Sequence, residues 1–366
     1  MRQWVLGIVV LQLLSALFLY YPVWRLSLWL GLAPEAAMSL GAIAFVSQLV
    51  VRLLLRRDGN RFTRLLRISA DFLLGLSPLL LATVICAEIL IVTTGLATQW
   101  VALSALMLSL LIGLWGVKKA SLPEVVPVTL RSPKLTSPLR FVQISDVHIG
   151  SRSSRFLRHI VDQVNDLQPD FLCITGDFID ERNISTERLA ALRDVVVPIY
   201  FCTGNHEHYE DLSDILERLE ELGVVILRGE RIERHGIQIV GFDDQSDPDF
   251  LQEALPTLGL RDDLFSLLLF HRPHGFVHAA ANGIDLKISG HTHKGQIRPF
   301  DLLVRMQFKY MSGLYQQGDA YLYVNEGTGT WGPTMRIGTR SEITLFEISP
   351  VVNEALSCDQ QEKVSN

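Results

Sequence analysis

Long stretches of apolar residues fill the first third of the chain and give way to a mixed pattern after about residue 120. A transmembrane helix needs about 20 mostly apolar residues to cross about 30 Å of hydrocarbon. A cleaved signal peptide would explain one such stretch but not several. The pattern predicts four transmembrane helices within residues 1–120, over Trp4–Tyr21, Ala33–Val51, Ala70–Thr93 and Trp100–Val117.

Positive charges indicate how these helices are oriented. The segment between the second and third runs carries Arg52, Arg56, Arg57, Arg61, Arg64 and Arg67, whereas residues 94–99 carry no charge. The positive-inside rule therefore places the arginine-rich segment, and with it Lys118 and Lys119 after the fourth run, in the cytoplasm. We expect a four-pass protein of the inner (cytoplasmic) membrane whose remaining chain faces the cytoplasm. Glu88, inside the third run, marks a transport site or contacts another helix.

Prolines interrupt the pattern directly after the apolar third. Residues 121–138 contain Pro123, Pro127, Pro133 and Pro138, which disfavour a regular helix and predict a linker. A separate domain is then expected over residues 139–349, and the polar residues 350–366 are expected to form a flexible tail.

Short apolar strands alternate with helical segments in this second domain. The predicted helices are Arg155–Asp166, Thr186–Asp194, Asp211–Leu222 and Gly275–Ala281. The predicted strands are Phe141–Ser145, Phe171–Thr175, Ile199–Cys202, Val224–Leu227, Ile237–Gly241, Leu264–Phe270, Leu286–Ser289, Ala320–Val324 and Ile343–Ile348. The alternation predicts an α/β domain with mixed sheets.

Composition and charge narrow the function classes. The chain of 366 residues is 48% hydrophobic and has a net charge of −6, which argues against a nucleic-acid surface built on general positive charge. Its mean hydropathy of +0.26 agrees with a membrane-embedded part. Four cysteines (Cys86, Cys173, Cys202 and Cys358) are widely spaced, so a disulfide scaffold is not expected and a reducing compartment fits.

Polar residues recur just after predicted strands. Asp146-Val147-His148 follows the first strand of the domain, Gly176-Asp177 the second, and Gly204-Asn205-His206-Glu207 comes soon after the third. His271 and Gly290-His291-Thr292-His293 follow two later strands. The glycines allow sharp turns that bring these side chains together. Carboxylate, amide and imidazole ligands without thiolate fit a site for Mn, Zn, Fe or similar ions.

In this order, the five motifs resemble the calcineurin-like metallophosphoesterases, and the resemblance covers residues 139–348. It implies a four-layer sandwich in which two mixed β-sheets are flanked by helices, here preceded by the four transmembrane helices. The segment YVNEGTGTWGPTMRIGTRSEI (321–343) further resembles the membrane-anchored bacterial branch that includes UDP-2,3-diacylglucosamine hydrolases.

The resemblance implies two divalent metal ions. One ion would be held by Asp146, His148, Asp177 and His293, and the other by Asp177, Asn205, His271 and His291, so that Asp177 bridges them. A hydroxide shared by both ions would then attack phosphorus. His206 would contact the phosphate and protonate the leaving oxygen. Glu207 either orients a histidine or is a surface acid.

Further residues are candidates for substrate binding or for purely structural roles. His208 either contacts substrate or is an exposed bystander, Lys294 either meets a phosphate or points to solvent, and Arg336 is also assigned to substrate. The glycine loop at 327–332 is expected near the metal site and not at a dinucleotide. We interpret the remaining histidines of the domain as structural: His159, His235, His274 and His278.

The predicted function is a membrane-anchored, metal-dependent phosphoesterase that hydrolyses a phosphodiester or pyrophosphate bond. Its substrate would be a lipid-linked or nucleotide-linked phosphate, and UDP-2,3-diacylglucosamine hydrolysis in lipid A synthesis would fit the location. The alternatives are a phosphatase acting on other nucleotide or protein phosphates, and a non-catalytic membrane scaffold that keeps the fold.

Overall fold

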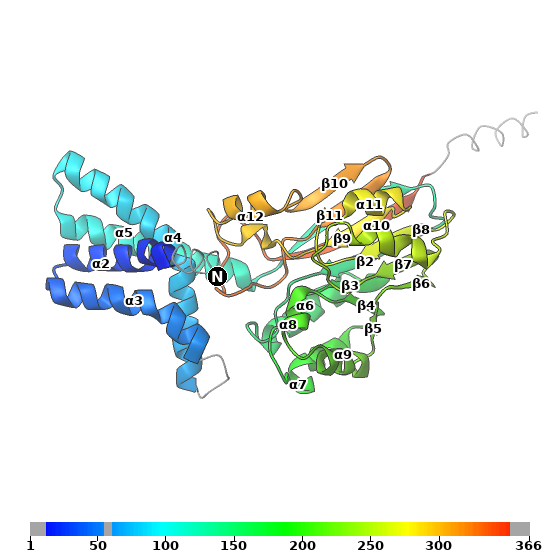
Figure 1. The fold of residues 1–366 in the computed structure, drawn as a ribbon, viewed down its shortest axis with the longest axis horizontal. Coiled ribbons are helices and arrows are strands. Elements are labelled where there is room, and N and C mark those ends of the chain that lie inside the picture. The colour runs from blue at the N-terminus through cyan, green and yellow to red at the C-terminus, as the bar shows by residue number, and fades with distance from the viewer. Residues whose placement is uncertain (1–11, 55–60, 352–366) are drawn as a thin grey trace, which may run out of the picture. The chain divides into compact units, whose positions relative to one another are not determined.

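The chain forms two compact units in the computed structural model, which describes residues 12–54 and 61–351 (Figure 1). The first, here called the helical unit, contains the residues up to Leu122 and two later segments, Gly295–Leu302 and Thr330–Thr339. The second, here called the phosphoesterase unit, contains Pro123–Lys294, Leu303–Gly329 and the chain from Arg340 onward. Two short pieces of the C-terminal half thus belong to the helical unit.

The described part of the helical unit includes three helices long and apolar enough to cross a membrane, over Pro34–Val51, Phe62–Thr94 and Thr98–Ser121. These three helices match the second, third and fourth predicted spans, and a fourth candidate span is not found among the described residues. Residues 4–11 of the first predicted run lie outside the described residues, and its remainder leads directly into a helix that carries Arg25. The elements are η1 (Ala16–Tyr20), α2 (Tyr21–Trp29), α3 (Pro34–Leu54), α4 (Arg61–Thr94) and α5 (Thr98–Ser121).

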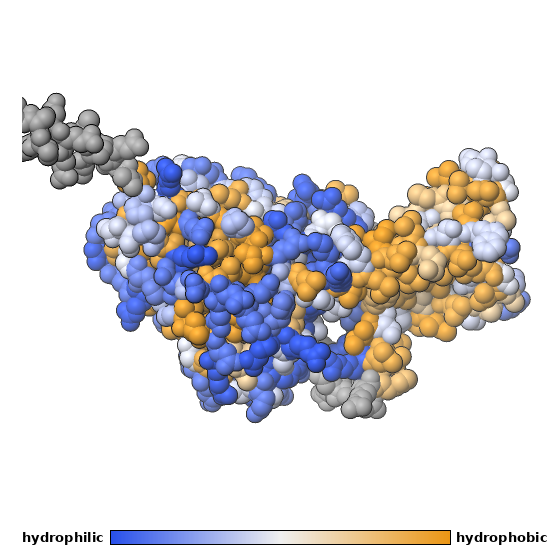
Figure 2. All heavy atoms as spheres, turned by 180° about the vertical axis from the view of Figure 1, so that it is seen from behind, coloured by the Kyte–Doolittle hydropathy of each residue, from blue (hydrophilic) through white to orange (hydrophobic). Residues whose placement is uncertain are grey.

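Apolar side chains lie on the outside of these helices, as Figure 2 shows in orange. Ile43 on α3, Ile89 on α4 and Leu111 on α5 are each about 60% exposed. A water-exposed helix would instead carry polar residues on its outer face. The outer surface therefore suits lipid.

Glu88 has a partner that its position in the sequence did not reveal. The Nε of Arg25 on α2 donates to the Glu88 carboxylate at 2.6 Å, and both side chains are about one third exposed. The Arg25 guanidinium also lies 4.7 Å from the centre of the Trp29 ring. Glu88 therefore links α4 to α2, in agreement with a helix-contact role.

Two six-stranded mixed sheets form the phosphoesterase unit. The first has the order β1-β12-β2-β3-β4-β5 and the second β10-β11-β9-β8-β7-β6. The strands of the first sheet are β1 (Glu124–Ser132), β12 (Glu342–Pro350), β2 (Leu139–Ile144), β3 (Phe171–Thr175), β4 (Ile199–Cys202) and β5 (Val224–Ile226). Those of the second are β10 (Gly313–Gln317), β11 (Ala320–Val324), β9 (Leu286–Ser289), β8 (Phe265–Leu269), β7 (Ile237–Gly241) and β6 (Glu230–Arg234).

The linker predicted over residues 121–138 is largely a strand. β1 pairs in parallel with β12, and Pro127 lies opposite Leu345. Proline is tolerated there because β1 is an edge strand, so a missing N–H need not break the ladder. The expected tail at 350–366 lies outside the described residues beyond Val351.

Three apolar layers hold the sandwich together. Between the sheets, the Phe141 ring stacks on Phe171 at 4.9 Å and on Phe346 at 4.7 Å. The outer faces are covered by helices through separate apolar clusters. The arrangement is the expected four-layer α/β sandwich with two mixed sheets (Figure 1). The helices and short 3-10 turns are α6 (Ser154–Asp166), α7 (Thr186–Leu189), η2 (Ala190–Asp194), α8 (Asn205–Tyr209), α9 (Leu212–Glu221), α10 (Phe250–Ala254), η3 (Leu255–Leu258), α11 (Phe276–Ala281), η4 (His293–Gly295) and α12 (Asp301–Gln307).

Candidate metal centre

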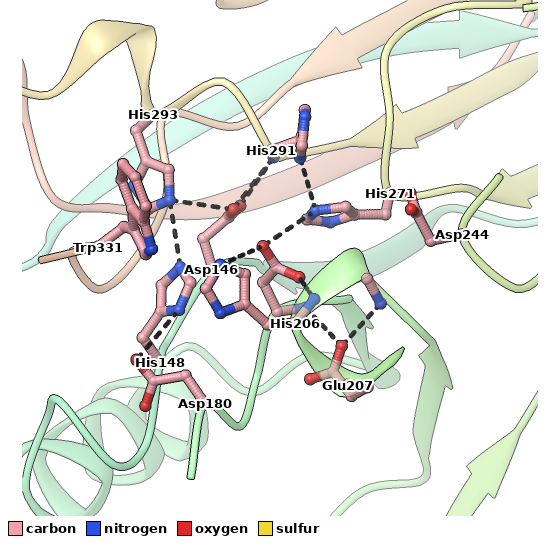
Figure 3. A network of polar contacts seen from close by, with 12 residues as sticks. Asp146, His148, Asp180, His206, Glu207, Asp244, His271, His291, His293 and Trp331 are labelled. Carbon is pink, nitrogen blue, oxygen red and sulfur yellow. Dashed lines mark hydrogen bonds and ion pairs between the residues drawn. The ribbon is translucent and has the colours of Figure 1, made fainter. Parts of the chain in front are cut away.

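The candidate ligands lie on loops that leave the ends of strands in both sheets. Asp146, His148, Asp177, His291 and His293 all have positive φ, between 47° and 72°. This left-handed conformation is unfavourable for residues with a Cβ and persists where the surroundings impose it. The backbone is thus bent at these five positions, and those of their side chains that are labelled in Figure 3 point toward a common centre.

Glycines make this convergence sterically possible. A Cβ at Gly290 would lie 1.9 Å from the Ser145 Oγ and 2.2 Å from an Asp146 carboxylate oxygen. A Cβ at Gly204 would lie 2.2 Å from an Asp177 carboxylate oxygen. The glycine positions noted in the sequence are therefore close approaches of backbone to ligand side chains, and not only turns.

Asp146, His148 and His293 form one group of ligand atoms. The His293 Nε2 lies 3.2 Å from Asp146 Oδ1 and 3.2 Å from the His148 Nε2. The backbone N–H of His291 also donates to the Asp146 carboxylate, at 3.0 Å. Because two ring nitrogens and a carboxylate oxygen face the same point, the group can hold one cation.

Asp177, His271 and His291 form a second group. The His271 Nε2 lies 3.2 Å from Asp177 Oδ2 and 3.1 Å from the His291 Nδ1. Its other nitrogen, Nδ1, lies 2.8 Å from the backbone oxygen of Thr175, which leaves Nε2 for the cluster. Asp177 also belongs to a third group with His148 and His206, so it connects the two ends of the cluster.

Asn205 and His206 complete the set at the start of α8. The Asn205 Oδ1 is buried and has no hydrogen-bond partner among the described residues. A buried amide oxygen left in this way is costly, and a cation would satisfy it. The His206 side chain is 17% exposed, and its Nε2 lies 4.0 Å from Asp177 Oδ2. The residues present therefore fit divalent metal ions, and His206 is open to solvent beside them.

Burial and charge together determine the electrostatics of the cluster. Burial disfavours an ionised Asp177, but the histidines around it, His271 first, hold the pKa of Asp177 well below its usual range. Burial likewise disfavours a proton on His271, yet Asp177 raises the pKa of His271 to about 10. Burial and the charge of His271 lower the pKa of His291 to about 3. The site thus combines ionised carboxylates with a preference for positive charge beside them.

Glu207 stabilises backbone and does not orient a histidine. Its buried carboxylate accepts hydrogen bonds from four N–H groups, at distances of 2.7–3.0 Å; the donors are Asp177, Phe178, Ile179 and Gly204. Burial and the nearby Asp177 charge raise the pKa of Glu207 to about 7. The acid beside the His148 ring is instead Asp180, whose Oδ2 lies 3.6 Å from the His148 Nδ1.

The three residues assigned to substrate contact lie in different surroundings. The His208 Nε2 is 3.2 Å from the Thr203 Oγ1, and the Lys294 Nζ donates to Glu326 at 2.8 Å. Arg336 is fully buried and belongs to the helical unit, where its backbone N–H donates to the Gly116 carbonyl at 3.0 Å. A substrate-binding role for Arg336 does not agree with this burial.

The sequence reasoning missed Arg272, the residue after His271. Its guanidinium binds both oxygens of Asp244, with Nε 2.8 Å from Oδ1, and its Nη1 lies 3.4 Å from the His291 Nε2. The position of Arg272 next to His271 was visible in the sequence. Its ion pair with Asp244 was not, because the two residues are 28 positions apart. The glycine loop was placed correctly, since the Gly329 N–H donates to the Asp146 carbonyl at 3.0 Å.

Comparison with known proteins agrees with this site. The family model described as calcineurin-like phosphoesterase matches residues 139–295. Over 233 residues the chain is 32% identical to the uncharacterized metallophosphoesterase YkoQ of Bacillus subtilis, and the match covers 57% of this chain and 83% of the relative. The chain therefore belongs to the calcineurin-like phosphoesterase family.

Two further relatives match over a similar region. The chain is 33% identical over 236 residues to an uncharacterized metallophosphoesterase of Campylobacter jejuni, covering 62% of this chain and 63% of the relative. It is 33% identical over 272 residues to a protein of Danio rerio described as a transmembrane protein with metallophosphoesterase domain, covering 66% of this chain and 61% of the relative. The chain thus spans less than two thirds of the length of these two proteins.

Proposed function

We propose that this protein is a membrane-anchored hydrolase that cleaves a phosphodiester or pyrophosphate bond with the help of two divalent metal ions. The observation that carries the proposal is the continuous chain of three ligand groups, in which Asp177 is shared by two. Asp146, His148, Asp177 and His293 would hold one ion. Asp177, Asn205, His271 and His291 would hold the other.

The metal ions, when bound, would neutralise charge on the phosphate and lower the pKa of a water molecule. The protein's own contribution is to fix the ligands on strained, glycine-supported loops and to keep most of them buried. The His206 imidazole is partly exposed, and its Nε2 lies 4.0 Å from Asp177 Oδ2. This position supports the proposal that His206 contacts the phosphate and gives a proton to the leaving oxygen.

Membrane anchoring is supported by the three candidate spans and by the description of the Danio rerio relative. We propose that the phosphoesterase unit faces the cytoplasm. Arg64 and Arg67 lie near the start of α4, and Lys118 and Lys119 lie in the last turn of α5, so an antiparallel pair of spans would put these charges on one side. The positive-inside rule makes that side cytoplasmic, and the phosphoesterase unit begins there, at Pro123.

A substrate that resides in the membrane would explain the anchor, because confinement to the same surface raises its effective concentration. We propose a lipid-linked or nucleotide-linked phosphate. UDP-2,3-diacylglucosamine combines both features and is proposed on motif resemblance alone.

The test uses the full-length protein in lipid nanodiscs, stripped of metal and then resupplied with Mn, Zn, Fe or Mg. Hydrolysis of bis-p-nitrophenyl phosphate is compared with that of p-nitrophenyl phosphate, and bound metal is measured by mass spectrometry. Asp177→Ala is expected to abolish activity and to reduce the metal content. Asp162→Ala, an exposed acid on α6, is the matched control and is expected to change neither.

Metal-dependent cleavage with preference for the diester would support the proposal. A folded, metal-loaded protein without activity on either ester would reject hydrolysis of simple esters and favour the scaffold alternative.

A further inference from the structure

A pocket of about 290 Å³ lies in the phosphoesterase unit, outside the cluster of candidate ligands. One wall comes from the chain just after His271 and the start of α11, and the other from the chain at the end of α12. Most of its lining is apolar, from Pro273, Phe276, Val277, Phe308 and Tyr310. Small-molecule sites begin at about 300 Å³, so the pocket suits one apolar group and not an entire large ligand.

Phe308 is shared between this pocket and the metal centre. Its ring packs edge-on against the ring of His291, with 5.2 Å between the centroids and 75° between the planes. The opposite wall begins at Pro273, two residues after His271. A group in the pocket would therefore be separated from a candidate metal ligand by the width of one aromatic ring.

The walls are fixed by packing that does not depend on a ligand. Phe276 is buried and packs edge-on against Tyr310 at 5.7 Å, and Tyr310 packs in turn against Tyr315 at 4.9 Å. A preformed apolar pocket binds without paying to order its own side chains. Val277 on α11, in contrast, is 48% exposed and is not part of the apolar core. Its side chain is therefore available to a ligand.

Apolar side chains are also exposed on α12, whose last residue, Gln307, lines the pocket. On that helix Leu303 is 61% and Met306 is 84% exposed. Exposed apolar side chains next to a pocket of this kind mark a binding surface more often than chance exposure does. The pocket and the exposed apolar side chains of α12 both favour an apolar ligand. The three candidate membrane spans favour the same kind of ligand, because they suit a lipid environment.

We propose that this pocket, here called the Phe308 pocket, binds an alkyl substituent of the phosphoester whose phosphate lies at the metal centre. The proposal rests on the phosphoesterase function proposed above and names a substrate class for it: esters that carry an apolar chain close to the phosphate. Selectivity would come from burying that chain, while the ligands and His206 act on the phosphate.

The test is isothermal titration of the metal-loaded, full-length protein in nanodiscs with hydrolysis-resistant methyl-, butyl- and hexylphosphonate, corrected by titration of empty nanodiscs. Affinity is expected to rise with chain length, by up to roughly fourfold for each methylene group buried. Val277→Glu places a charge in the pocket and is expected to remove this dependence while leaving methylphosphonate binding within about twofold. Val196→Glu, at a 78% exposed site outside the pocket, is the control and should keep the full dependence.

Equal affinities for all three phosphonates, or an unchanged dependence in Val277→Glu, would overturn the proposal. The same preparations are assayed on bis-p-nitrophenyl phosphate so that the two hypotheses can fail separately. Turnover without chain-length dependence would reject the pocket alone. Chain-length-dependent binding without any turnover would reject the hydrolase function and leave the apolar site in place.

Discussion

The carboxylate of Glu207 accepts a hydrogen bond from the backbone N–H of Asp177 at 3.0 Å, which ties the loop after β3 to the one after β4. The same carboxylate accepts from Gly204 at 2.7 Å and from two further N–H groups of the Asp177 loop. A single buried acid thus positions the residue that we expect both metal ions to share.

Replacing this acid should therefore weaken both fold and site. In Glu207→Gln one side-chain oxygen becomes an NH2 group, so two backbone N–H groups lose their acceptor. At about 1–3 kcal/mol for each, the free energy of unfolding should fall by about 2–6 kcal/mol. Urea unfolding and bound metal are measured, with the exposed Glu217→Gln on α9 as control. Unchanged stability would contradict the role assigned to Glu207.

Replacing Asn205 should weaken metal binding without lowering the stability of the metal-free protein, because its Oδ1 has no hydrogen-bond partner among the described residues. Asn205→Ala should leave the stability of the metal-free protein within about 1 kcal/mol of the parent. It should reduce the rise in melting temperature that added Mn produces, because a ligand has been removed. An equal rise in both proteins would show that Asn205 does not bind metal.

Gly116 on α5 should matter for activity although it lies in a helix suited to the membrane. A Cβ there would lie 2.8 Å from the Met335 Cγ and 3.0 Å from the Arg336 carbonyl. Gly116→Leu should displace the 330–339 segment at a cost of about 1–3 kcal/mol. Because that segment directly follows Gly329, whose N–H donates to the Asp146 carbonyl, hydrolysis should fall as well.

Trypsin provides the direct readout for this displacement. Arg336 is fully buried in the parent, so cleavage after it should become faster in Gly116→Leu. Leu114→Val, at a 59% exposed position of the same helix, should leave both cleavage and hydrolysis unchanged. If trypsin cleaves Gly116→Leu after Arg336 no faster than it cleaves the parent, the 330–339 segment does not need a glycine at position 116 in order to pack against α5.

The ion pair of Arg25 and Glu88 should show strong coupling. Arg25→Ala leaves the Glu88 charge without its partner, and the loss should stay below the about 3–5 kcal/mol found for fully buried pairs, since both side chains are about one third exposed. Replacing both residues by leucine should be less harmful than the single change. Detergent-solubilised thermal unfolding compares the parent with both variants, and a double variant that is less stable than Arg25→Ala would argue against the pair.

Much of the phosphoesterase unit could be predicted from local sequence. Buried strands such as β3 and β4 are continuous apolar runs and were located to the residue. The missed strands are β1, which contains Pro127, and the largely exposed β6 and β10. All three are edge strands, where prolines and polar residues are tolerated and the apolar signal is weak.

The candidate site was predictable to a similar extent. Short motifs gave seven candidate ligand positions, and the structure brings all of them but Asn205 into groups of facing side-chain atoms that could hold a metal ion, with Asn205 next to His206 in the chain. The supporting contacts depend on residues far apart in sequence, such as Arg272 with Asp244 or His148 with Asp180. No local sequence pattern indicates such pairs. For the same reason the sequence did not show that Gly295–Leu302 and Thr330–Thr339 belong to the helical unit.

The two late segments of the helical unit, Gly295–Leu302 and Thr330–Thr339, affect the order in which the chain can fold during synthesis. The chain passes from one unit to the other after Leu122, Lys294, Leu302, Gly329 and Thr339. Synthesis runs from the N-terminus, and early parts of a chain generally fold first. Here Gly116 must wait for its packing partners Met335 and Arg336, which are synthesised more than 200 residues later. A chain truncated before residue 330 would therefore leave an incomplete helical unit, with unfilled surface exposed to quality control.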